Sequence, residues 1–335
     1  MPHPKGNRMK HTRRTFLKTG AAALALPAIP ALAAQSAASA APSTPSPETR
    51  QTAMKTFTLN DGNVIPSVGF GVFMIPNDGP TYEAVKTALQ AGYRHIDTAA
   101  AYQNESDVGK AVRDSGIPRS EIFVTSKLWI QDFGYEAAKK GIATSLEKLG
   151  LDYIDLYLLH QPYGDVPGAW RALEEAKAAG KIRSIGVSNM TPKFWREFSP
   201  HFKTVPAVNQ VEFNPFFQQK ELRKIMDAAG VKLQAWYPLG HGNTELLEHP
   251  AITALAKKYG KNSGQIILRF EVQDGVITLP KSTSPQRIAG NIDIFDFALT
   301  DEEMQALRAL DTGKGAHDPD APGVAERLKS YNIHD

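Results

Sequence analysis

The chain has 335 residues, of which 42% are hydrophobic and 22% are charged, as expected for one large globular domain or two ordinary ones. It contains no cysteine, which excludes disulfides, iron–sulfur clusters and thiolate nucleophiles. Residues 1–33 carry six basic residues and no acidic one, so the remainder has 32 basic against 35 acidic residues. This balance does not indicate a nucleic-acid-binding surface.

The first 33 residues have the pattern of a cleaved export signal. A basic segment precedes the apolar run TGAAALALPAIPALAA, and the small residues at 31–33 are typical of a cleavage site. The pair Arg13 and Arg14 before TFLK resembles the twin-arginine signal, which directs folded proteins to the bacterial periplasm. The apolar run is too short for a stable membrane span. A fortuitous basic tail or a misassigned start would give the same pattern.

The export segment is followed by a stretch of different composition. Residues 34–53 are rich in Ser, Pro and Ala and predict a low-complexity linker. We therefore expect a twin-arginine-type signal peptide over residues 1–33, this linker over 34–53, and one folded domain over 54–335.

The folded part begins with FTLNDGNVIPSVGFG, in which the turn residues at 60–62 predict an N-terminal β-hairpin. After it, short β-branched runs alternate with amphipathic helical segments. The predicted strands are residues 68–71, 94–97, 122–126, 154–159, 184–187, 207–210, 232–236 and 276–280. The predicted helices between them include residues 80–91, 135–149, 168–179, 219–229 and 251–259.

Eight strands alternating with helices predict an α/β fold with a parallel sheet, either open and doubly wound or closed into a (β/α)8 TIM barrel. The count of eight and the absence of a G-x-G-x-x-G motif after the first strand favour the barrel. In such a barrel the carboxyl ends of all strands meet at one face, and polar side chains placed there converge.

Four polar residues are placed to meet at that face. Asp97 ends the second predicted strand, Lys127 follows the third, and His160 ends the fourth, while Tyr102 lies just past Asp97. An ammonium beside a phenol lowers the phenol's pKa from about 10. Asp97 would keep Lys127 charged, and His160 could hydrogen-bond the phenol from the other side. The set suits protonation of a carbonyl oxygen and suits a metal poorly. Each residue alone could equally be packing or a plain salt bridge.

The segment LPKSTSPQRIAGN at 279–291 follows the eighth strand, where barrels commonly bind phosphate. Thr283 or Ser284 would cap a short helix with Arg287 in its first turn. Lys281 and Arg287 together suit a phosphate monoester, although a solvated basic turn is the alternative.

Further strand ends carry Ser188, Asn189, Gln210 and Trp236. The first three could hydrogen-bond an amide-bearing ring that stacks on the indole. An inward Asn or Gln could otherwise only satisfy backbone groups.

The stretches GYRHIDTAAAYQNE, IFVTSKLW, IDLYLLH, KIRSIGVSN and LPKSTSPQRIAGN, in this order, resemble the aldo-keto reductases over about residues 56–312. The resemblance implies a (β/α)8 barrel and NADPH-dependent reduction of aldehydes or ketones to alcohols by hydride transfer, without metal or flavin. AWYPLG and HQP are most similar to the bacterial 2,5-diketo-gluconate and methylglyoxal reductases.

By this resemblance Tyr102 is the general acid, with Asp97, Lys127 and His160 as its partners. The implied contacts of NADPH are Ser188, Asn189 and Gln210 at the carboxamide, Trp236 stacked on the nicotinamide, Lys281, Ser282 and Arg287 at the 2′-phosphate, and Asn291 at the adenine. Two positions depart from the family. Gly290 replaces a common Glu that helps to hold adenine, and Gln161 replaces a common substrate-facing Trp, which makes the pocket more polar.

We therefore expect an exported, periplasmic monomer that reduces a small-molecule carbonyl substrate and meets the twin-arginine export machinery. An intact set of four residues disfavours a nicotinamide-binding sensory or auxiliary role with little turnover. A Schiff-base enzyme using Lys127 or Lys281 is a third possibility, disfavoured at Lys127 because Asp97 would keep it protonated. The segment after Thr312 gives no chemical indication of the substrate.

Overall fold

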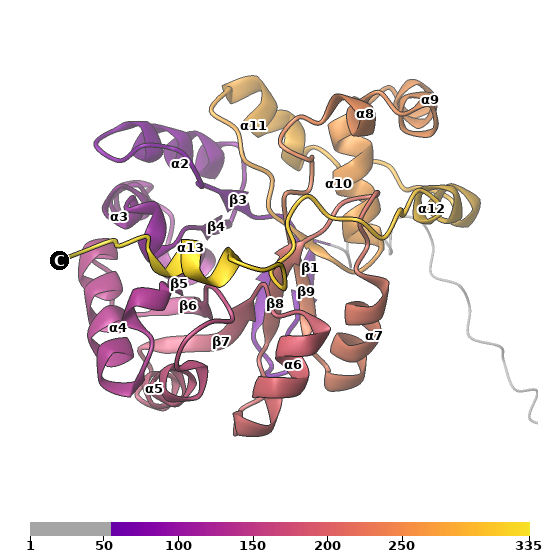
Figure 1. Cartoon of the computed structure of the whole chain (residues 1–335). Coiled ribbons are helices and arrows are strands. Elements are labelled where there is room, and N and C mark those ends of the chain that lie inside the picture. Colours follow the sequence, from indigo (N-terminus) through magenta and orange to yellow (C-terminus); the bar gives the residue numbers. More distant parts are fainter. Residues whose placement is uncertain (1–54) are drawn as a thin grey trace, which may run out of the picture. The chain divides into compact units, whose positions relative to one another are not determined.

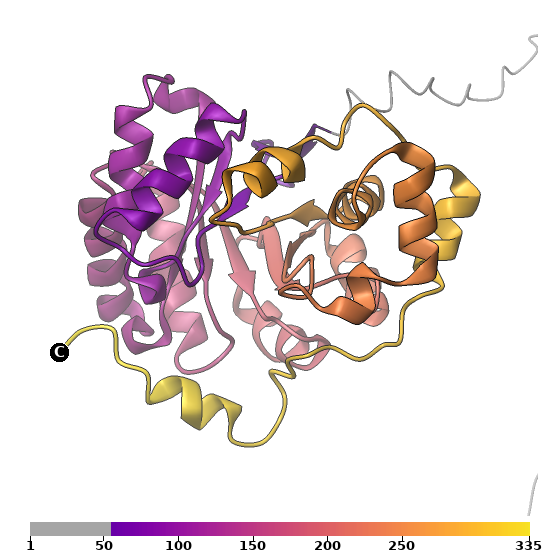
Figure 2. The ribbon, with the colours of Figure 1, turned by 90° about the horizontal axis from the view of Figure 1, so that it is seen from above.

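The computed structural model describes residues 55–335, so the predicted signal peptide and linker lie outside the described residues. The described part is an α/β barrel in which helices surround a ring of parallel strands (Figure 1 and Figure 2). Within residues 55–335, no helix has the length and apolar character needed to cross a membrane.

A short antiparallel hairpin precedes the barrel. Strand β1 (Thr56–Thr58) pairs with β2 (Val64–Pro66), and Phe57 lies opposite Ile65. Gly62 takes a left-handed φ of 85° in the turn, a conformation that glycine adopts without strain. Buried side chains of the hairpin pack with inward residues of the barrel strands in one apolar cluster, which includes Leu59, Ile65, Phe123, Leu156, Leu158, Val208 and Ile277. The hairpin therefore closes one end of the barrel.

The eight barrel strands are β3 (Phe70–Gly71), β4 (His95–Asp97), β5 (Phe123–Leu128), β6 (Ile154–Leu159), β7 (Ile182–Ser188), β8 (Val208–Glu212), β9 (Lys232–Trp236) and β10 (Ile277–Thr278). Each pairs in parallel with its sequence neighbour. The ring closes between the first and last strands, because the Gly69 N–H donates to the Thr278 carbonyl and the Thr278 N–H donates to the Ser67 carbonyl, both at 2.9 Å. This closed parallel sheet confirms the predicted (β/α)8 barrel.

Helices cover the outside of this ring. They are α2 (Pro80–Gln90), α3 (Glu105–Asp114), α4 (Tyr135–Leu149), α5 (Val166–Ala178), α6 (Pro192–Phe198), α7 (Lys220–Ala229), α8 (Thr244–Leu247), α9 (Pro250–Tyr259), α10 (Ser263–Gln273), α11 (Pro285–Ile292) and α12 (Asp301–Arg308). A last helix, α13 (Val324–Lys329), belongs to the C-terminal segment and lies across one end of the barrel (Figure 1). Local sequence fixes several ends. A capping box of Asn262 and Gln265 starts α10, and Gly150 ends α4 in the left-handed region.

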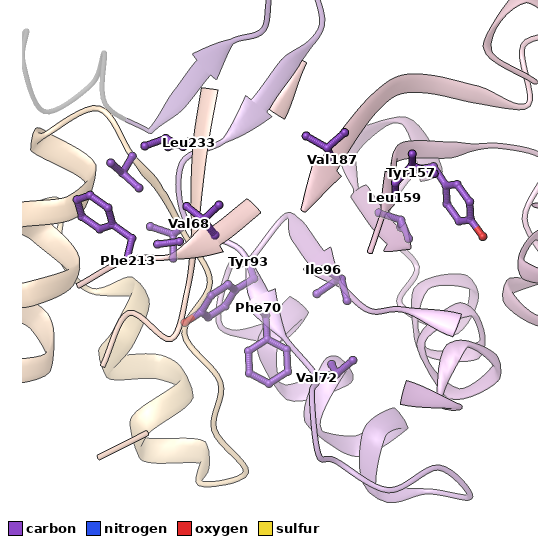
Figure 3. Close-up of a cluster of buried hydrophobic side chains, with 14 of the residues drawn as sticks. Val68, Phe70, Val72, Tyr93, Ile96, Tyr157, Leu159, Val187, Phe213 and Leu233 are labelled. Atoms are coloured by element: carbon purple, nitrogen blue, oxygen red, sulfur yellow. The ribbon is translucent and has the colours of Figure 1, made fainter. Parts of the chain in front are cut away.

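The main hydrophobic core lies between the strands and these helices. Figure 3 shows part of it, with Phe70, Ile96 and Val187 among the labelled side chains. Side chains alternate along a strand, so an outward Ile96 requires its neighbour Asp97 to point into the barrel. The apolar pattern of the strands thus places polar residues inside, at the end opposite the hairpin.

The C-terminal segment runs back over this polar end of the barrel (yellow in Figure 1). The Tyr163 hydroxyl donates to the Pro319 carbonyl and the Trp129 indole N–H donates to the Tyr331 carbonyl, both at 2.7 Å. These bonds fix the segment against the loops that follow β6 and β5.

Some element bounds differ from the predicted ones. Strand β5 extends to Leu128, so Lys127 lies within the strand rather than after it. Strand β10 covers only Ile277–Thr278, although the Leu279 N–H still donates to the Ala235 carbonyl of β9 and the Pro280 carbonyl accepts from the Gly71 N–H of β3, both at 3.1 Å. Of the two capping candidates, Ser284 caps α11 by accepting from the Arg287 N–H.

Candidate active site

The structure brings Asp97, Tyr102, Lys127 and His160 together at the polar end of the barrel. Asp97 is the last residue of β4, Lys127 lies in β5, and His160 directly follows β6. Tyr102 ends a single helical turn, η1 (Ala100–Tyr102), that follows β4. The one-repeat spacing seen in the sequence therefore becomes proximity in space.

The ammonium of Lys127 is at the centre of the group and is fully buried. Its Nζ donates to Asp97 Oδ1 at 2.6 Å, to the Thr98 carbonyl at 2.8 Å and to the Tyr102 hydroxyl at 3.4 Å. Three N–H donors therefore have three acceptors. Burial alone would lower the pKa of Lys127, but the charges and hydrogen bonds of Asp97 and Tyr102 together more than offset this and raise the pKa above its ordinary value. The amine stays protonated and is not a nucleophile at neutral pH.

The phenol of Tyr102 differs from expectation in the direction of its pKa. Burial raises the pKa of Tyr102 above 10, and the nearby charge of Lys127 offsets only part of that rise. The expected net lowering was wrong, because the sequence shows the neighbouring charge but not the loss of solvent. The phenol therefore keeps its proton at neutral pH.

His160 lies on the other side of the phenol. Its ring meets that of Tyr102 edge to face, with centroids 5.5 Å apart, and meets Trp129 in the same way at 5.2 Å. Among the described residues, no hydrogen bond joins His160 to the phenol oxygen, in contrast to the expected pairing. Burial, together with the charge of Lys127, holds the pKa of His160 well below its usual range, so the imidazole is neutral.

Gln210 supports Asp97 from β8. Its Nε2 donates to Asp97 Oδ2 at 2.8 Å and to Gln234 Oε1 at 2.8 Å. Ser188 donates its hydroxyl proton to the backbone carbonyl of Gln210 at 2.8 Å. Burial raises the pKa of Asp97, and Lys127 and Gln210 both oppose that rise. The residue predicted to contact a carboxamide thus also holds the Asp97 carboxylate.

Asn189 connects the backbone at His160 to the indole of Trp236. Its φ of 56° is left-handed, which asparagine tolerates better than most residues. Its Nδ2 donates to the His160 carbonyl at 3.1 Å, and its Oδ1 accepts from Trp236 Nε1 at 2.9 Å. The predicted pair Asn189 and Trp236 therefore lies beside His160.

The predicted phosphate residues gather at the start of α11. Ser282 is buried, and its Oγ accepts from Arg287 Nε at 3.2 Å and from the Ser284 N–H at 3.1 Å. Lys281 and Arg287 are exposed, and neither pairs with a carboxylate anywhere in residues 55–335. Two uncompensated cations beside a helix start fit a dianionic phosphate. Asn291 is buried two turns further along the helix.

A cavity of about 490 Å³ lies beside Asn189 and Trp236. Residues 313–320 of the C-terminal segment form its far wall. Glu212 holds that wall in place, because its carboxylate accepts from the backbone N–H of Ala316 at 2.8 Å and of His317 at 2.9 Å. The segment that gave no chemical indication in the sequence therefore bounds a cavity that Asn189 and Trp236 also line, while none of the four central residues does.

Comparison with known proteins agrees with this geometry. The model of the aldo/keto reductase family matches residues 68–312. The glyoxal reductase of Bacillus subtilis is 46% identical over 261 residues, which cover 77% of this chain and 94% of that protein. The morphine 6-dehydrogenase of Pseudomonas putida is 44% identical over 269 residues, 76% of this chain and 90% of that protein.

A solved aldo/keto reductase from Brucella melitensis superposes with a TM-score of 0.73 at 46% identity, covering 76% of this chain and 99% of that one. The chain belongs to the aldo/keto reductase family. It is therefore an oxidoreductase, and the family expected from its motifs is confirmed.

Sequence reasoning missed several residues of this aldo-keto reductase site. Phe73 contacts Tyr102 with ring centroids 5.0 Å apart, and His241 lies 6.5 Å from Phe73 across the rim. His317 packs against Trp236 at 5.2 Å. Phe73 and His241 both follow predicted strands, which was an available signal. No signal pointed to His317, because only the folded C-terminal segment brings it to the rim.

Replacing Lys127 by Met should destabilise this reductase by about 3–5 kcal/mol, because Asp97 would remain buried without its partner. The raised pKa of an unpaired Asp97 favours the protonated carboxyl, so the loss should be greatest at neutral pH and shrink as the pH falls. Denaturant unfolding at several pH values measures this change in the free energy of unfolding.

The double variant Lys127→Met with Asp97→Asn should recover much of that stability without recovering activity. The exposed pair Lys110–Asp114 on α3 offers a matched control, since Lys110→Met should barely move the unfolding midpoint. A Lys127→Met protein as stable as the wild type would contradict the role given to the buried pair.

Proposed function

We propose that this aldo-keto reductase uses NADPH to reduce aldehydes or ketones to alcohols, with Tyr102 as the general acid. The observation that carries the proposal is the position of Lys127, whose ammonium contacts both Asp97 and the Tyr102 hydroxyl. An enclosed cation against a phenol has little use in packing, because its burial is costly. It is well placed to stabilise a phenolate that forms during a reaction.

When bound, NADPH supplies the hydride that the carbonyl carbon receives. The residues that would hold it are Lys281, Ser282 and Arg287 at the 2′-phosphate, Asn291 at the adenine, Ser188, Asn189 and Gln210 at the carboxamide, and Trp236 against the ring. Two features support the fit: the unpaired cations at the start of α11, and the Gln210 oxygen, which no described residue contacts.

Residues of the chain itself supply the proton and stabilise the phenolate that remains. Because the pKa of Tyr102 is raised, its hydroxyl carries a proton for donation to a substrate oxygen that becomes negative. A phenol is a far stronger acid than the alcohol that forms, so the transfer is favourable even with the raised pKa. The Lys127 ammonium, 3.4 Å away, stabilises the resulting phenolate. Neutral His160 can donate a hydrogen bond to the same substrate oxygen and so orient it.

The substrate class follows from the site and from the named relatives. Relatives named for glyoxal and for morphine share 46% and 44% of their aligned residues with this chain. They differ greatly in the size of the molecule they are named for, whereas the carbonyl chemistry is common to both. We infer an aldehyde or ketone substrate.

Replacing Tyr102 by Phe should lower kcat by about 100-fold or more, the scale expected for removal of a general acid. Binding of NADPH should be retained, because the phenol oxygen is not among the proposed cofactor contacts. Oxidation of NADPH, followed at the nicotinamide absorbance over a panel of aldehydes and ketones, measures the first effect. Fluorescence titration with NADPH measures the second.

A Tyr102→Phe protein with wild-type kcat would rule out the phenol as the acid. Wild-type protein that binds NADPH but reduces no member of the panel would instead indicate a sensory or auxiliary role.

Replacing Arg287 or Lys281 by Met should weaken NADPH binding by about tenfold or more, because each removes a charge-assisted contact to phosphate. Affinity for NADH, which lacks the 2′-phosphate, should change little. The exposed Lys224 on α7 is a matched control, and Lys224→Met should leave both affinities unchanged. An equal loss for both nucleotides would show that these residues do not read the 2′-phosphate.

We propose in addition that the chain is exported folded through the twin-arginine pathway, with its cofactor already bound. Expression in a bacterium with that pathway should give periplasmic protein that begins after Ala33 and contains nucleotide, both measured by intact mass spectrometry. Changing Arg13 and Arg14 to Lys should keep the protein untrimmed in the cytoplasm. Untrimmed wild-type protein found only in the cytosol would contradict the proposal.

A further inference from the structure

The residue behind Gln210 has no role in the chemistry described so far. Gln234 is the register partner of Gln210 on the neighbouring strand, β9. Both side chains lie inside the barrel, with 0% of Gln234 and 2% of Gln210 exposed.

The hydrogen bonds of Gln210 run in one direction only. Its side-chain nitrogen has two protons, and both are used, one by Asp97 Oδ2 and one by Gln234 Oε1. A reversed Gln210 amide would turn its oxygen toward the carboxylate of Asp97 and the oxygen of Gln234, which is repulsive. The Gln210 oxygen consequently makes no hydrogen bond to any described residue. It is presented as a free acceptor.

Gln234 itself is poorly satisfied. Its Nε2 is buried without a hydrogen-bond partner among the described residues. An enclosed N–H group without a partner costs folding free energy. A leucine of similar size would avoid that cost but would leave one Gln210 N–H without its acceptor, so the two effects roughly cancel and stability does not explain the amide. The one hydrogen bond of the Gln234 side chain, which its oxygen accepts from Gln210, explains why an amide is present there.

We propose that Gln234 is a positioning residue, which fixes the Gln210 amide so that its nitrogen supports Asp97 and its oxygen faces a bound carboxamide. The inference rests on the proposed function, because it assigns that oxygen to the nicotinamide. The path from Gln234 to the phenol runs through Gln210, Asp97 and Lys127, with hydrogen bonds of 2.8, 2.8, 2.6 and 3.4 Å.

Gln234→Leu removes the acceptor for Gln210 together with the unsatisfied Nε2. The variant should be about as stable as the wild type, because one unsatisfied N–H group replaces another, and kcat/KM should fall about 3- to 10-fold, as for the loss of one neutral hydrogen bond. Affinity for NADP+ should fall by a similar factor. Affinity for 2′,5′-ADP should not change, because this fragment lacks the nicotinamide and reaches only Lys281 and Arg287.

Gln234→Glu is the conservative counterpart, since it keeps an oxygen where Gln210 donates. An enclosed carboxyl is unfavourable, so this variant should be the less stable of the two yet the more active. Activity and stability should therefore rank the two variants in opposite orders. A residue that only supports the fold would rank them in the same order. Thermal unfolding, kcat/KM and the two affinities are measured on the full chain.

Wild-type kcat/KM and NADP+ affinity in Gln234→Leu would overturn the inference. So would a loss of activity that parallels a loss of stability in both variants. If the wild type binds NADP+ without turning over, the proposed reaction fails, and the affinity comparison still decides the role of Gln234. If the wild type binds no NADP+, both the function and this role are refuted.

Discussion

The buried charge of Lys127 is the constraint on which the rest of this site depends. An ammonium removed from water is tolerated only when each of its protons has an acceptor and a negative charge lies close by. Asp97 supplies the charge, and the Thr98 carbonyl and the Tyr102 hydroxyl complete the set. Asp97 in turn needs a donor, which Gln210 provides. The reactive phenol is thus one end of a network that the barrel must satisfy in order to fold.

The barrel interior has two regions, an apolar one that stabilises the fold and the polar one that contains this network. Near the hairpin the inward residues are apolar and pack as a closed cluster with Leu59 and Ile65. Toward the carboxyl ends of the strands they are polar and bonded to one another. The same alternation along each strand produces both regions, with the outward face mostly apolar. Polar chemistry at one end is supported by tight packing at the other.

Much of this arrangement was predictable from the sequence. The strand period and the eightfold repeat place Asp97, Lys127 and His160 at one face without knowledge of a single distance. The net pKa direction of Tyr102 was not predictable, because burial depends on the surrounding loops. Nor was the second bond of Gln210 to Gln234, which requires the register of two strands distant in sequence. The rim residue His317 depends on the path of the C-terminal segment, which carries no repeating pattern.

The Glu212 carboxylate holds residues 313–320 in place by accepting hydrogen bonds from the main-chain N–H groups of Ala316 and His317. Backbone donors are the same whatever residue carries them. The side chains of residues 313–320 can consequently be exchanged while the wall keeps its place over the barrel. New molecular preferences can arise there by point changes, with no need to rebuild the ionised interior to which we assign the proton transfer.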